Sequence, residues 1–231
     1  VFDVKKIKPD IAFIHNPYDD TNFVTTVDPR FYSYELKKNV ECLVYCPYYS
    51  TVGAVPKAQS LCKAYLYSDY ILTQSEYQLE FYDKSIPVNK YLPMGSPKFD
   101  KAIGLNNERK ENPDSFYAKV SKEWIEKSKG KKVYFYNTSI TWLLFNTPLF
   151  LDKMKYVFDS FARHRDVAVL FWRPHPLLED TLNALRPEFK ERYEGLKRKF
   201  LDENIGILDE TPDISIAVAF CDAFIGDTST S

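Results

Sequence analysis

Short apolar runs alternate with longer amphipathic segments along the chain, and this alternation predicts strands separated by helices. In the first hundred residues, the apolar runs predict strands at 11–15, 43–46, 69–73 and 88–94. The segments between them predict helices at 29–38, 56–68 and 75–84. Such alternation is typical of parallel sheets whose strands are joined by right-handed helical crossovers.

The alternation stops at about residue 105 and restarts at residue 132. Asn, Glu and Lys dominate the intervening segment, which predicts a solvated helix at 113–129. Beyond it we expect strands at 132–136, 167–172, 205–208 and 223–225, and helices at 149–163, 177–200 and 212–220. The prediction is an α/β fold with two Rossmann-like parallel-sheet domains at 1–106 and 132–231, joined by a linker helix at 107–131.

Neither predicted domain has a full set of elements. The first begins without a clear opening strand and helix, and the second stops after a strand with no helix to cover it. A sheet left in this way would expose apolar surface and an unprotected edge. We therefore expect both domains to be incomplete, and the sequence to be part of a longer two-domain chain.

Charge and composition exclude several function classes. The 231 residues carry 31 Lys and Arg against 32 Asp and Glu, so no overall field attracts nucleic acid. No apolar run is long enough to span a membrane, and no targeting segment opens the chain, so we expect a cytoplasmic protein. The four cysteines have no convincing zinc-ligand spacing, so we assign no metal ligands, leave metal dependence open and expect no cofactor.

Candidate chemistry lies in the turns that follow the strands of the second domain. Ligands of open parallel sheets bind beyond the carboxyl ends of the strands. Four polar turns occupy these positions: Asn137-Thr138-Ser139, Arg173-Pro174-His175-Pro176, Asp209-Glu210-Thr211-Pro212 and Asp227-Thr228-Ser229-Thr230-Ser231. Each turn alone could simply cap a helix. Together they predict a site for the diphosphate of a nucleotide-linked donor.

The predicted roles follow from the residue types. Arg173 or His175 would be the charge partner of the diphosphate. Hydrogen bonds would come from hydroxyl groups and from the last turn, with a helix N-terminus behind them. The residues expected to bind the donor are Thr138, Ser139, Arg173, His175, Asp227, Ser229, Thr230 and Ser231.

Three of these segments carry a resemblance to a known family. The segments are Trp172-Arg173-Pro174-His175-Pro176, Glu210-Thr211-Pro212-Asp213-Ile214 and Ile225-Gly226 with the turn that follows them. Their order resembles the C-terminal half of the CDP-glycerol glycerophosphotransferase family, the enzymes of teichoic acid synthesis. The segment Met94-Gly95-Ser96-Pro97-Lys98-Phe99-Asp100 is similar to the family's Gly-x-Pro-x-x-Asp turn.

The resemblance implies a GT-B architecture, in which two Rossmann-like domains face each other across a cleft. It also implies that the second domain holds the CDP-linked donor and that the first supplies a histidine base. His175 and the turn at 227–231 would then meet the donor diphosphate. The sequence departs from the family at the Trp-His-Gly-Thr-Pro-Leu-Lys motif, because the strand at 43–46 runs instead into Pro47-Tyr48-Tyr49-Ser50.

His15 is the only histidine of the first half, so it is the candidate base there. It follows a predicted strand, and Asp19 or Asp20 could orient its imidazole. The alternative is a hydrogen-bonded histidine that closes the strand. His15 and His175 are therefore the two candidate catalytic residues.

The resulting hypothesis is a transferase at the membrane periphery that moves glycerophosphate, or a related polyol phosphate, from a CDP-linked donor. The acceptor would be a cell-envelope polymer of the teichoic acid type, or a membrane-anchored precursor of it. Two alternatives stay open: a GT-B glycosyltransferase or epimerase that uses a UDP-sugar, and a nucleotide-binding relative without catalytic activity.

Overall fold

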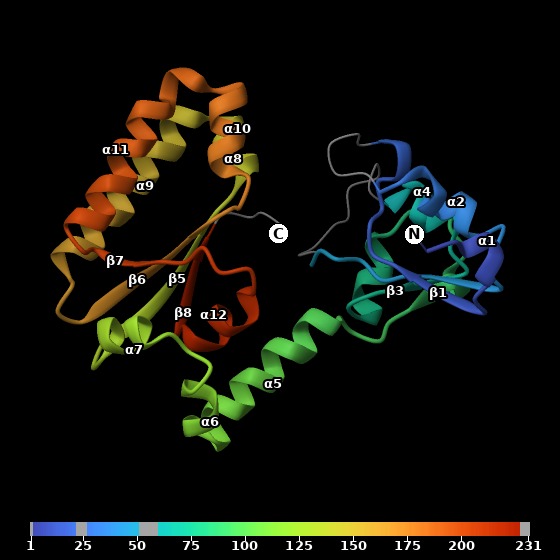
Figure 1. Cartoon of the computed structure of the whole chain (residues 1–231), viewed down its shortest axis with the longest axis horizontal. Coiled ribbons are helices and arrows are strands. Elements are labelled where there is room, and N and C mark those ends of the chain that lie inside the picture. Colours follow the sequence, from blue (N-terminus) through green and yellow to red (C-terminus); the bar gives the residue numbers. More distant parts are fainter. Residues whose placement is uncertain (1, 22–26, 51–59, 227–231) are drawn as a thin grey trace. The chain divides into compact units, whose positions relative to one another are not determined.

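The computed structural model describes residues 2–21, 27–50 and 60–226, and the chain divides between Phe99 and Asp100 into two compact units (Figure 1). Each unit contains a four-stranded sheet in which every strand pair is parallel. The prediction of an α/β fold with two Rossmann-like domains is therefore confirmed.

The first unit has the strand order β1-β2-β3-β4, so successive strands are added in one direction. Its strands are β1 (Ile11–Ile14), β2 (Cys42–Tyr45), β3 (Tyr70–Leu72) and β4 (Tyr91–Leu92). Its helices are α1 (Val4–Ile7), α2 (Ser33–Leu36) and α4 (Lys63–Tyr67), with 3-10 turns η1 (Asp19–Thr21), η2 (Pro29–Phe31), η3 (Glu76–Phe81) and η4 (Val88–Lys90).

The described core of the first unit lies on one face of its sheet. Leu43 packs with Val4 of α1 and Leu36 of α2, and Tyr45 packs with Tyr65 of α4. Side chains alternate between the faces of a strand, so the opposite face carries Ile11, Phe13, Cys42, Val44, Tyr70, Leu72 and Leu92. On that face Ile11 is 55% exposed and Phe13 is 69% exposed, while Val44 is buried.

The second unit has the strand order β7-β6-β5-β8. Its strands are β5 (Lys132–Thr138), β6 (Ala168–Pro174), β7 (Gly206–Leu208) and β8 (Ala223–Gly226). Its helices are α5 (Pro97–Glu111), which starts just before the division, α6 (Pro113–Tyr117), α7 (Lys122–Ser128), α8 (Ile140–Phe145), α9 (Thr147–Arg163), α10 (Leu178–Leu185), α11 (Lys190–Asp202) and α12 (Ile214–Phe220), with the 3-10 turn η5 (Pro187–Phe189).

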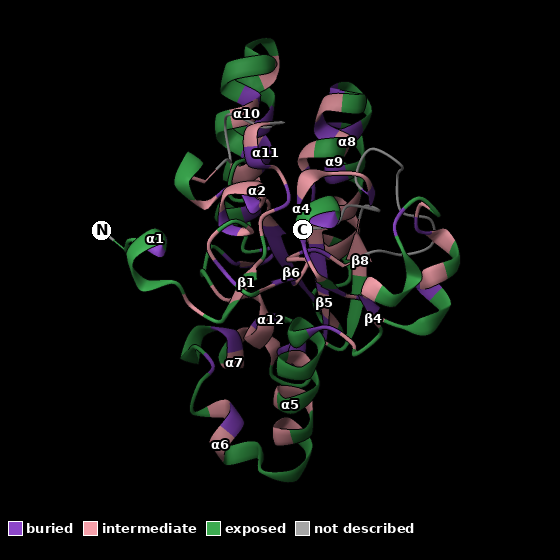
Figure 2. Cartoon of the chain, turned by 90° about the vertical axis from the view of Figure 1, so that its right-hand side faces the viewer, coloured by how far each residue is buried: buried purple, intermediate pink, exposed green. Residues whose placement is uncertain are grey.

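Both faces of the second sheet are covered. Leu170 and Trp172 pack into a cluster that includes Phe158 of α9 and Phe200 of α11. The neighbouring Phe171 points to the other face, where its ring meets Trp124 of α7 at a centroid distance of 4.5 Å. In Figure 2 the buried colour gathers on β5 and β6, the two central strands. Burial on both faces explains why these strands read as continuous apolar runs.

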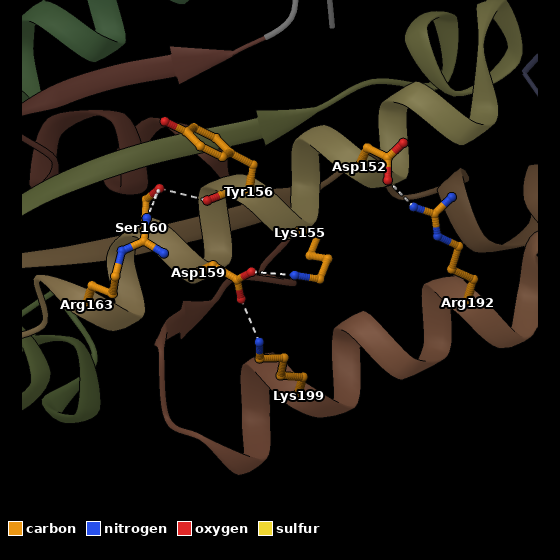
Figure 3. Close-up of polar contacts among 8 residues, drawn as sticks. All are labelled: Asp152, Lys155, Tyr156, Asp159, Ser160, Arg163, Arg192 and Lys199. Carbon is orange, nitrogen blue, oxygen red and sulfur yellow. Dashed lines mark hydrogen bonds and ion pairs between the residues drawn. The ribbon is translucent and has the colours of Figure 1, made fainter.

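Ion pairs join α9 to α11 on the outside of the first of these clusters (Figure 3). Asp159 of α9 accepts hydrogen bonds from Lys155 at 2.6 Å and from Lys199 of α11 at 2.5 Å. Arg192 of α11 pairs with Asp152 near the start of α9. These groups are partly exposed, so each pair contributes little on its own, and the apolar contact beneath them holds the helices together.

The segment 107–131 differs from the expected linker helix. It belongs to the second unit and contains the end of α5 together with α6 and α7. Phe116 is fully buried and Trp124 is 7% exposed, both in the cluster beneath the second sheet. Two large apolar residues in a polar segment give α6 and α7 a buried face, so this segment is part of the domain.

Two other helices differ from the sequence prediction for local reasons. The helix expected at 177–200 is divided into α10 and α11, because Pro187 removes an N–H donor and starts a 3-10 turn. The helix expected at 75–84 is a 3-10 turn over Glu76–Phe81. No helix in the described part of the chain combines the length and the apolarity that crossing a bilayer requires.

Candidate functional site

The carboxyl ends of the second sheet lie in register at one edge. Thr138 at the end of β5 pairs with Pro174 on β6, and Asn137 pairs with Gly226 at the end of β8. On the other side, Trp172 of β6 pairs with Leu208 at the end of β7. Because all four strands are parallel, the turns that follow them leave from the same edge.

The strand order places a topological switch point between β5 and β8. The chain adds β6 and β7 on one side of β5, then returns to place β8 on the other side. It leaves β5 through α8 and α9, which pack on one face, and enters β8 from α12 on the opposite face. A crevice forms where connections depart to opposite faces, and ligands of such sheets bind there.

Thr138 and Ser139 stand at this switch point and are almost fully buried. The Thr138 hydroxyl oxygen accepts a hydrogen bond from the Trp172 indole N–H at 3.2 Å. The Ser139 hydroxyl oxygen accepts from the Trp142 backbone N–H at 3.3 Å and so caps α8. The hydrogen bonds fix the position of both hydroxyl groups at the end of β5.

Arg173 is held in a buried ion pair. Its Nη1 bonds the Asp209 carboxylate, and its Nη2 donates to the Thr211 carbonyl oxygen at 2.7 Å. Asp209 also accepts from the Thr211 backbone N–H at 3.0 Å and from its hydroxyl at 2.7 Å. The negative charge of Asp209 offsets that of Arg173, so the pair joins the ends of β6 and β7 as a neutral unit.

His175 follows the ion pair at the end of β6. Its backbone N–H donates to the Thr138 carbonyl oxygen at 3.0 Å, and its Nδ1 accepts from the Leu177 backbone N–H at 3.1 Å. Burial lowers the pKa of the imidazole, since the charged form loses hydration there. The Nδ1 contact assigns the proton of the neutral ring to Nε2, which leaves His175 as a neutral hydrogen-bond donor.

A cavity of about 290 Å³ beside His175 is acidic. Glu179, Asp180 and Glu210 line it, together with the Arg173–Asp209 pair. Lys197 bridges Glu179 at 2.7 Å and Glu210 at 3.1 Å. Lys197 offsets one of these three carboxylate charges and the Arg173–Asp209 pair is neutral, so the lining keeps a net negative charge that disfavours a diphosphate in this cavity. The switch point, whose hydroxyl groups are uncharged, is therefore the candidate for a diphosphate site at this edge.

The remaining predicted donor residues cannot be placed. Asp227, Ser229, Thr230 and Ser231 lie outside the described residues. The described chain ends at Gly226, whose register partner is Asn137 of β5. These four residues follow Gly226 in the sequence.

His15 lies at the end of β1 in the first unit and is exposed. The expected carboxylate partners are otherwise engaged. Asp19 accepts from the Ser33 backbone N–H at 3.0 Å, and Asp20 pairs with Lys63 at 2.5 Å. Within the described residues neither carboxylate contacts His15, so the expectation that Asp19 or Asp20 orients the imidazole is wrong. His15 lines an apolar cavity of about 360 Å³ beside β1.

The sequence does not predict that Asp209 forms an ion pair with Arg173 and neutralises its charge. The turn at 209–212 carries polar groups after a strand, which is a signal for a site but not for an ion pair. Arg173 and Asp209 are separated by 36 residues, so only the pairing of β6 with β7 brings them together. Within the described residues, no group of three or more His, Cys, Asp or Glu side chains is placed to hold a metal ion.

Comparisons with known proteins find similarity at the level of structure. No family model matches the chain, and no curated protein matches it. A solved structure of a variant of the wall teichoic acid polymerase TagF is 18% identical, with a TM-score of 0.51. The similarity covers 95% of this chain and 58% of that polymerase chain, so this chain spans a little over half of the polymerase's length.

A second structure of that polymerase variant, soaked with CDPG for 15 minutes, is 15% identical with a TM-score of 0.46. This similarity covers 96% of this chain and 58% of that polymerase chain. At such low identity the first similarity shows a shared fold, which agrees with an α/β fold of two Rossmann-like domains.

Proposed function

We propose that this chain belongs to a transferase that moves glycerophosphate, or a related polyol phosphate, from a CDP-linked donor onto a teichoic-acid-like acceptor. The observation that carries the proposal is the switch point of the second sheet. There the buried hydroxyls of Thr138 and Ser139 stand beside the end of β8, and the sequence that follows β8 is rich in hydroxyl groups. A nucleotide-linked donor needs a site of this kind for its diphosphate.

Two further observations support the class of donor. The order of the Arg-Pro-His-Pro, Thr-Pro-Asp-Ile and Gly-Asp-Thr-Ser segments resembles that of the CDP-glycerol glycerophosphotransferases. The fold is shared with a wall teichoic acid polymerase. Fold alone leaves the substrate open, so the choice of a CDP-linked donor rests on the sequence motifs.

In this proposal the residues of the second unit have distinct tasks. Thr138, Ser139 and the turn with Asp227, Ser229, Thr230 and Ser231 bind the diphosphate. His175 is joined to the end of β5 by the hydrogen bond from its backbone N–H to the Thr138 carbonyl oxygen, and its Nε2 donates to a phosphate oxygen there because its Nδ1 is already an acceptor. Arg173 acts as a positioning residue, since its ion pair with Asp209 fixes the β6 end that carries His175.

The proposed reaction is a phosphoryl transfer from the donor to the acceptor hydroxyl. The oxygen of an acceptor hydroxyl forms a bond to the phosphorus that carries the polyol, and the bond from that phosphorus to the CMP oxygen breaks. His15 accepts the proton of the hydroxyl, and CMP leaves as the anion. Positioning of the two substrates and stabilisation of charge on the phosphate oxygens supply most of the rate. The donor is a substrate in this scheme, and no cofactor takes part.

The place of action follows from the acceptor. A growing envelope polymer is attached to a membrane, so we propose that the protein works in the cytoplasm at the membrane periphery. One observation favours a second candidate function. His15 has no carboxylate partner among the described residues, which suits a nucleotide-binding relative without turnover.

The test of the donor site is a calorimetric titration of the full chain with CDP-glycerol and with UDP-glucose. Thr138→Val removes the hydroxyl but keeps the shape, and the loss of one hydrogen bond predicts about tenfold weaker CDP-glycerol binding. Thr147→Val is the matched control, because Thr147 is also buried but bonds the Leu143 carbonyl at the start of α9. Equal binding of the two donors, or equal effects of the two variants, contradicts the proposal.

Turnover separates the two candidate functions. A transferase releases CMP when donor and acceptor are mixed, and His15→Ala should lower that rate at least a hundredfold with donor affinity unchanged. A protein that only binds the nucleotide releases no CMP, whatever residue occupies position 15.

A further inference from the structure

A second cavity of the second unit lies at the edge of the sheet opposite the switch point. Its volume is about 620 Å³, and its lining includes Lys132 and Val133 at the start of β5 and Asp222 just before β8. Figure 1 shows α7, which leads into β5, and α8, which follows it, at opposite ends of this sheet. The lining residues lie between Arg109 and Asp222 in the sequence, so the cavity, here called the amino-edge cavity, uses neither end of the described chain.

Arg109 of α5 fixes the back wall of the amino-edge cavity. Its Nη1 donates to the Ala219 carbonyl oxygen at 3.0 Å, and its Nη2 donates to the Asp222 carboxylate at 3.2 Å. The same carboxylate accepts from the Val133 backbone N–H at 2.9 Å. These bonds join α5, the end of α12 and the start of β5. Within this pair the two charges offset each other.

Three lysines give the cavity its charge. Lys129, Lys131 and Lys132 all line it, and none of them forms an ion pair within the part of the chain that the structure describes. The one other acid of the lining is Glu126. Three lysines against one glutamate leave an excess of two positive charges beside a neutral Arg109–Asp222 pair. A concave wall of low dielectric concentrates the field of such charges, so the cavity attracts a dianion.

The floor of the cavity is apolar. It is formed by Tyr117, Ile125, Val133, Val167 and Phe220, of which Val133 and Phe220 belong to the cluster beneath the sheet. Val167 is 57% exposed. Inorganic phosphate would leave this apolar surface in water, whereas an organic group attached to the phosphate would cover it.

The size and charge of the cavity together indicate the class of ligand. Small-molecule sites have volumes of about 300–1,000 Å³, and the amino-edge cavity lies within that range. A phosphate monoester carries a charge of about −1.5 to −2 at pH 7, which matches the excess of two positive charges. The cavity therefore suits an organic phosphate monoester of about the size of a nucleotide.

We propose that the amino-edge cavity binds a soluble organic phosphate monoester, with Lys129, Lys131 and Lys132 around the phosphate and the organic group on the apolar floor. This site uses none of the residues assigned to the diphosphate at the switch point. The proposal is therefore independent of the transferase activity, and each can fail without the other.

The first experiment titrates the full chain with AMP, adenosine and inorganic phosphate, and follows the backbone amide signals by NMR. AMP should shift the signals of residues 129–133. Adenosine lacks the charge and inorganic phosphate lacks the organic group, so each should bind there at least tenfold more weakly. Equal binding of AMP and either of the other two probes overturns the proposal. Shifts by AMP confined to residues 138–140 and 226 also overturn it, because they place AMP at the switch point alone.

Variants of the protein locate the charge that binds the phosphate. Lys131→Glu combined with Lys132→Glu should weaken AMP binding at least tenfold and reduce its dependence on salt. Lys110→Glu combined with Lys122→Glu is the matched control, because both lysines are exposed, lie on α5 and α7 and do not line the cavity. The two pairs change the net charge equally, so an equal loss of affinity overturns the proposal. The three probes remain decisive if the first variant fails to fold.

A further arm separates a soluble ligand from a lipid headgroup, since phosphatidic acid is also a phosphate monoester. The full chain and the Lys131→Glu, Lys132→Glu variant are sedimented with vesicles of phosphatidylcholine that contain phosphatidic acid. We expect the two proteins to sediment to the same extent. Sedimentation that depends on these lysines, together with no binding of AMP at millimolar concentration, would show that they face a membrane and would overturn the proposal.

Discussion

The two sheets have the same number of parallel strands but different strand orders, and the two orders go with different coverage of the sheet faces. In the first unit the order β1-β2-β3-β4 has no reversal, and the described core lies on one face. In the second unit the order β7-β6-β5-β8 contains a reversal, and cores lie on both faces. Right-handed crossovers explain this, because a change in the direction of strand addition moves the helices to the other face.

The consequence is a division of chemistry between the units. The reversal in the second unit marks the ends of β5 and β8 as the position where ligands of open parallel sheets bind. In the first unit, Ile11 and Phe13 are exposed on the face opposite the described core. A small-molecule site is therefore expected in the second unit.

The largest effect is expected from breaking the Arg173–Asp209 ion pair, which links β6 to the end of β7. Asp209→Ala leaves the buried Arg173 guanidinium without its partner, and should lower the free energy of unfolding by about 3–5 kcal/mol. The measurement is urea unfolding followed by tryptophan fluorescence, because the three tryptophans, at positions 124, 142 and 172, all lie in the second unit.

Lys101→Ala is the control for this prediction. It breaks an ion pair with Asp213 in which both side chains are more than 40% exposed, and should change stability by about 0.5 kcal/mol or less. A similar loss for both variants would mean that Arg173 and Asp209 do not form a buried pair.

The next prediction tests the difference between the two sheets directly. Leu170→Ala and Phe171→Ala remove buried side chains from opposite faces of β6, and each should cost about 3 kcal/mol. In the first unit, Leu43→Ala should cost about as much, whereas Ile11→Ala should change stability by about 0.5 kcal/mol or less.

Unfolding of these four variants should be followed by circular dichroism, which reports on both units. A cost of 2 kcal/mol or more for Ile11→Ala, on the scale expected of buried aliphatic residues, would show that the second face of the first sheet is covered after all.

A smaller effect concerns the hydroxyl of Tyr91 in the first unit. Within the described residues this oxygen is buried and has no hydrogen-bond partner. Tyr91→Phe removes an unsatisfied polar atom, so it should be neutral or should stabilise by up to about 1 kcal/mol. Thermal denaturation measures the change, and a clear loss of stability would indicate that the hydroxyl has a partner.

The smallest predicted effect is a pH dependence from His175. Burial lowers its pKa in the folded state below the ordinary value of 6.5, so the unfolded state binds the proton more tightly. The resulting contribution to stability is present above pH 6.5 and is lost as the pH falls through that value toward the lower folded pKa.

His175→Asn keeps a hydrogen-bond acceptor for the Leu177 N–H and does not titrate. The stability of this variant should therefore depend less on pH between 5 and 7 than that of the unchanged protein. His164→Asn is the control, since His164 is exposed at the end of α9. Equal pH profiles for the unchanged protein and His175→Asn would contradict the assignment of a neutral, partly buried imidazole at His175.

The fold could be predicted because its main signal is local. All eight strands are short apolar runs, and the order of elements requires a parallel sheet in each half. The segment with Phe116 and Trp124 carries a weaker signal, because two buried aromatic residues stand among many polar ones. Their burial depends on β6 and α12, which follow much later in the chain.

The candidate site could be predicted only in part, for the same reason. Parallel strands bring the turns after them to one edge, so Thr138, Ser139 and His175 could be placed from the sequence. The partners of Arg173, Asp19 and Asp20 could not, because these side chains are engaged by Asp209, Ser33 and Lys63, which are distant in sequence. The acidic cavity lies at the ends of β6 and β7, and the switch point lies at the ends of β5 and β8. The two can be told apart only once the strand order is known.

The most direct test of the account is a hydrogen-exchange footprint of CDP-glycerol on the full chain. Binding at the switch point predicts slower exchange at Ser139, Ile140 and Gly226, with residues 179–180 and 209–211 unchanged. A footprint confined to those two acidic segments, or no footprint at saturating CDP-glycerol, would contradict the claim that the β5 and β8 ends bind the donor.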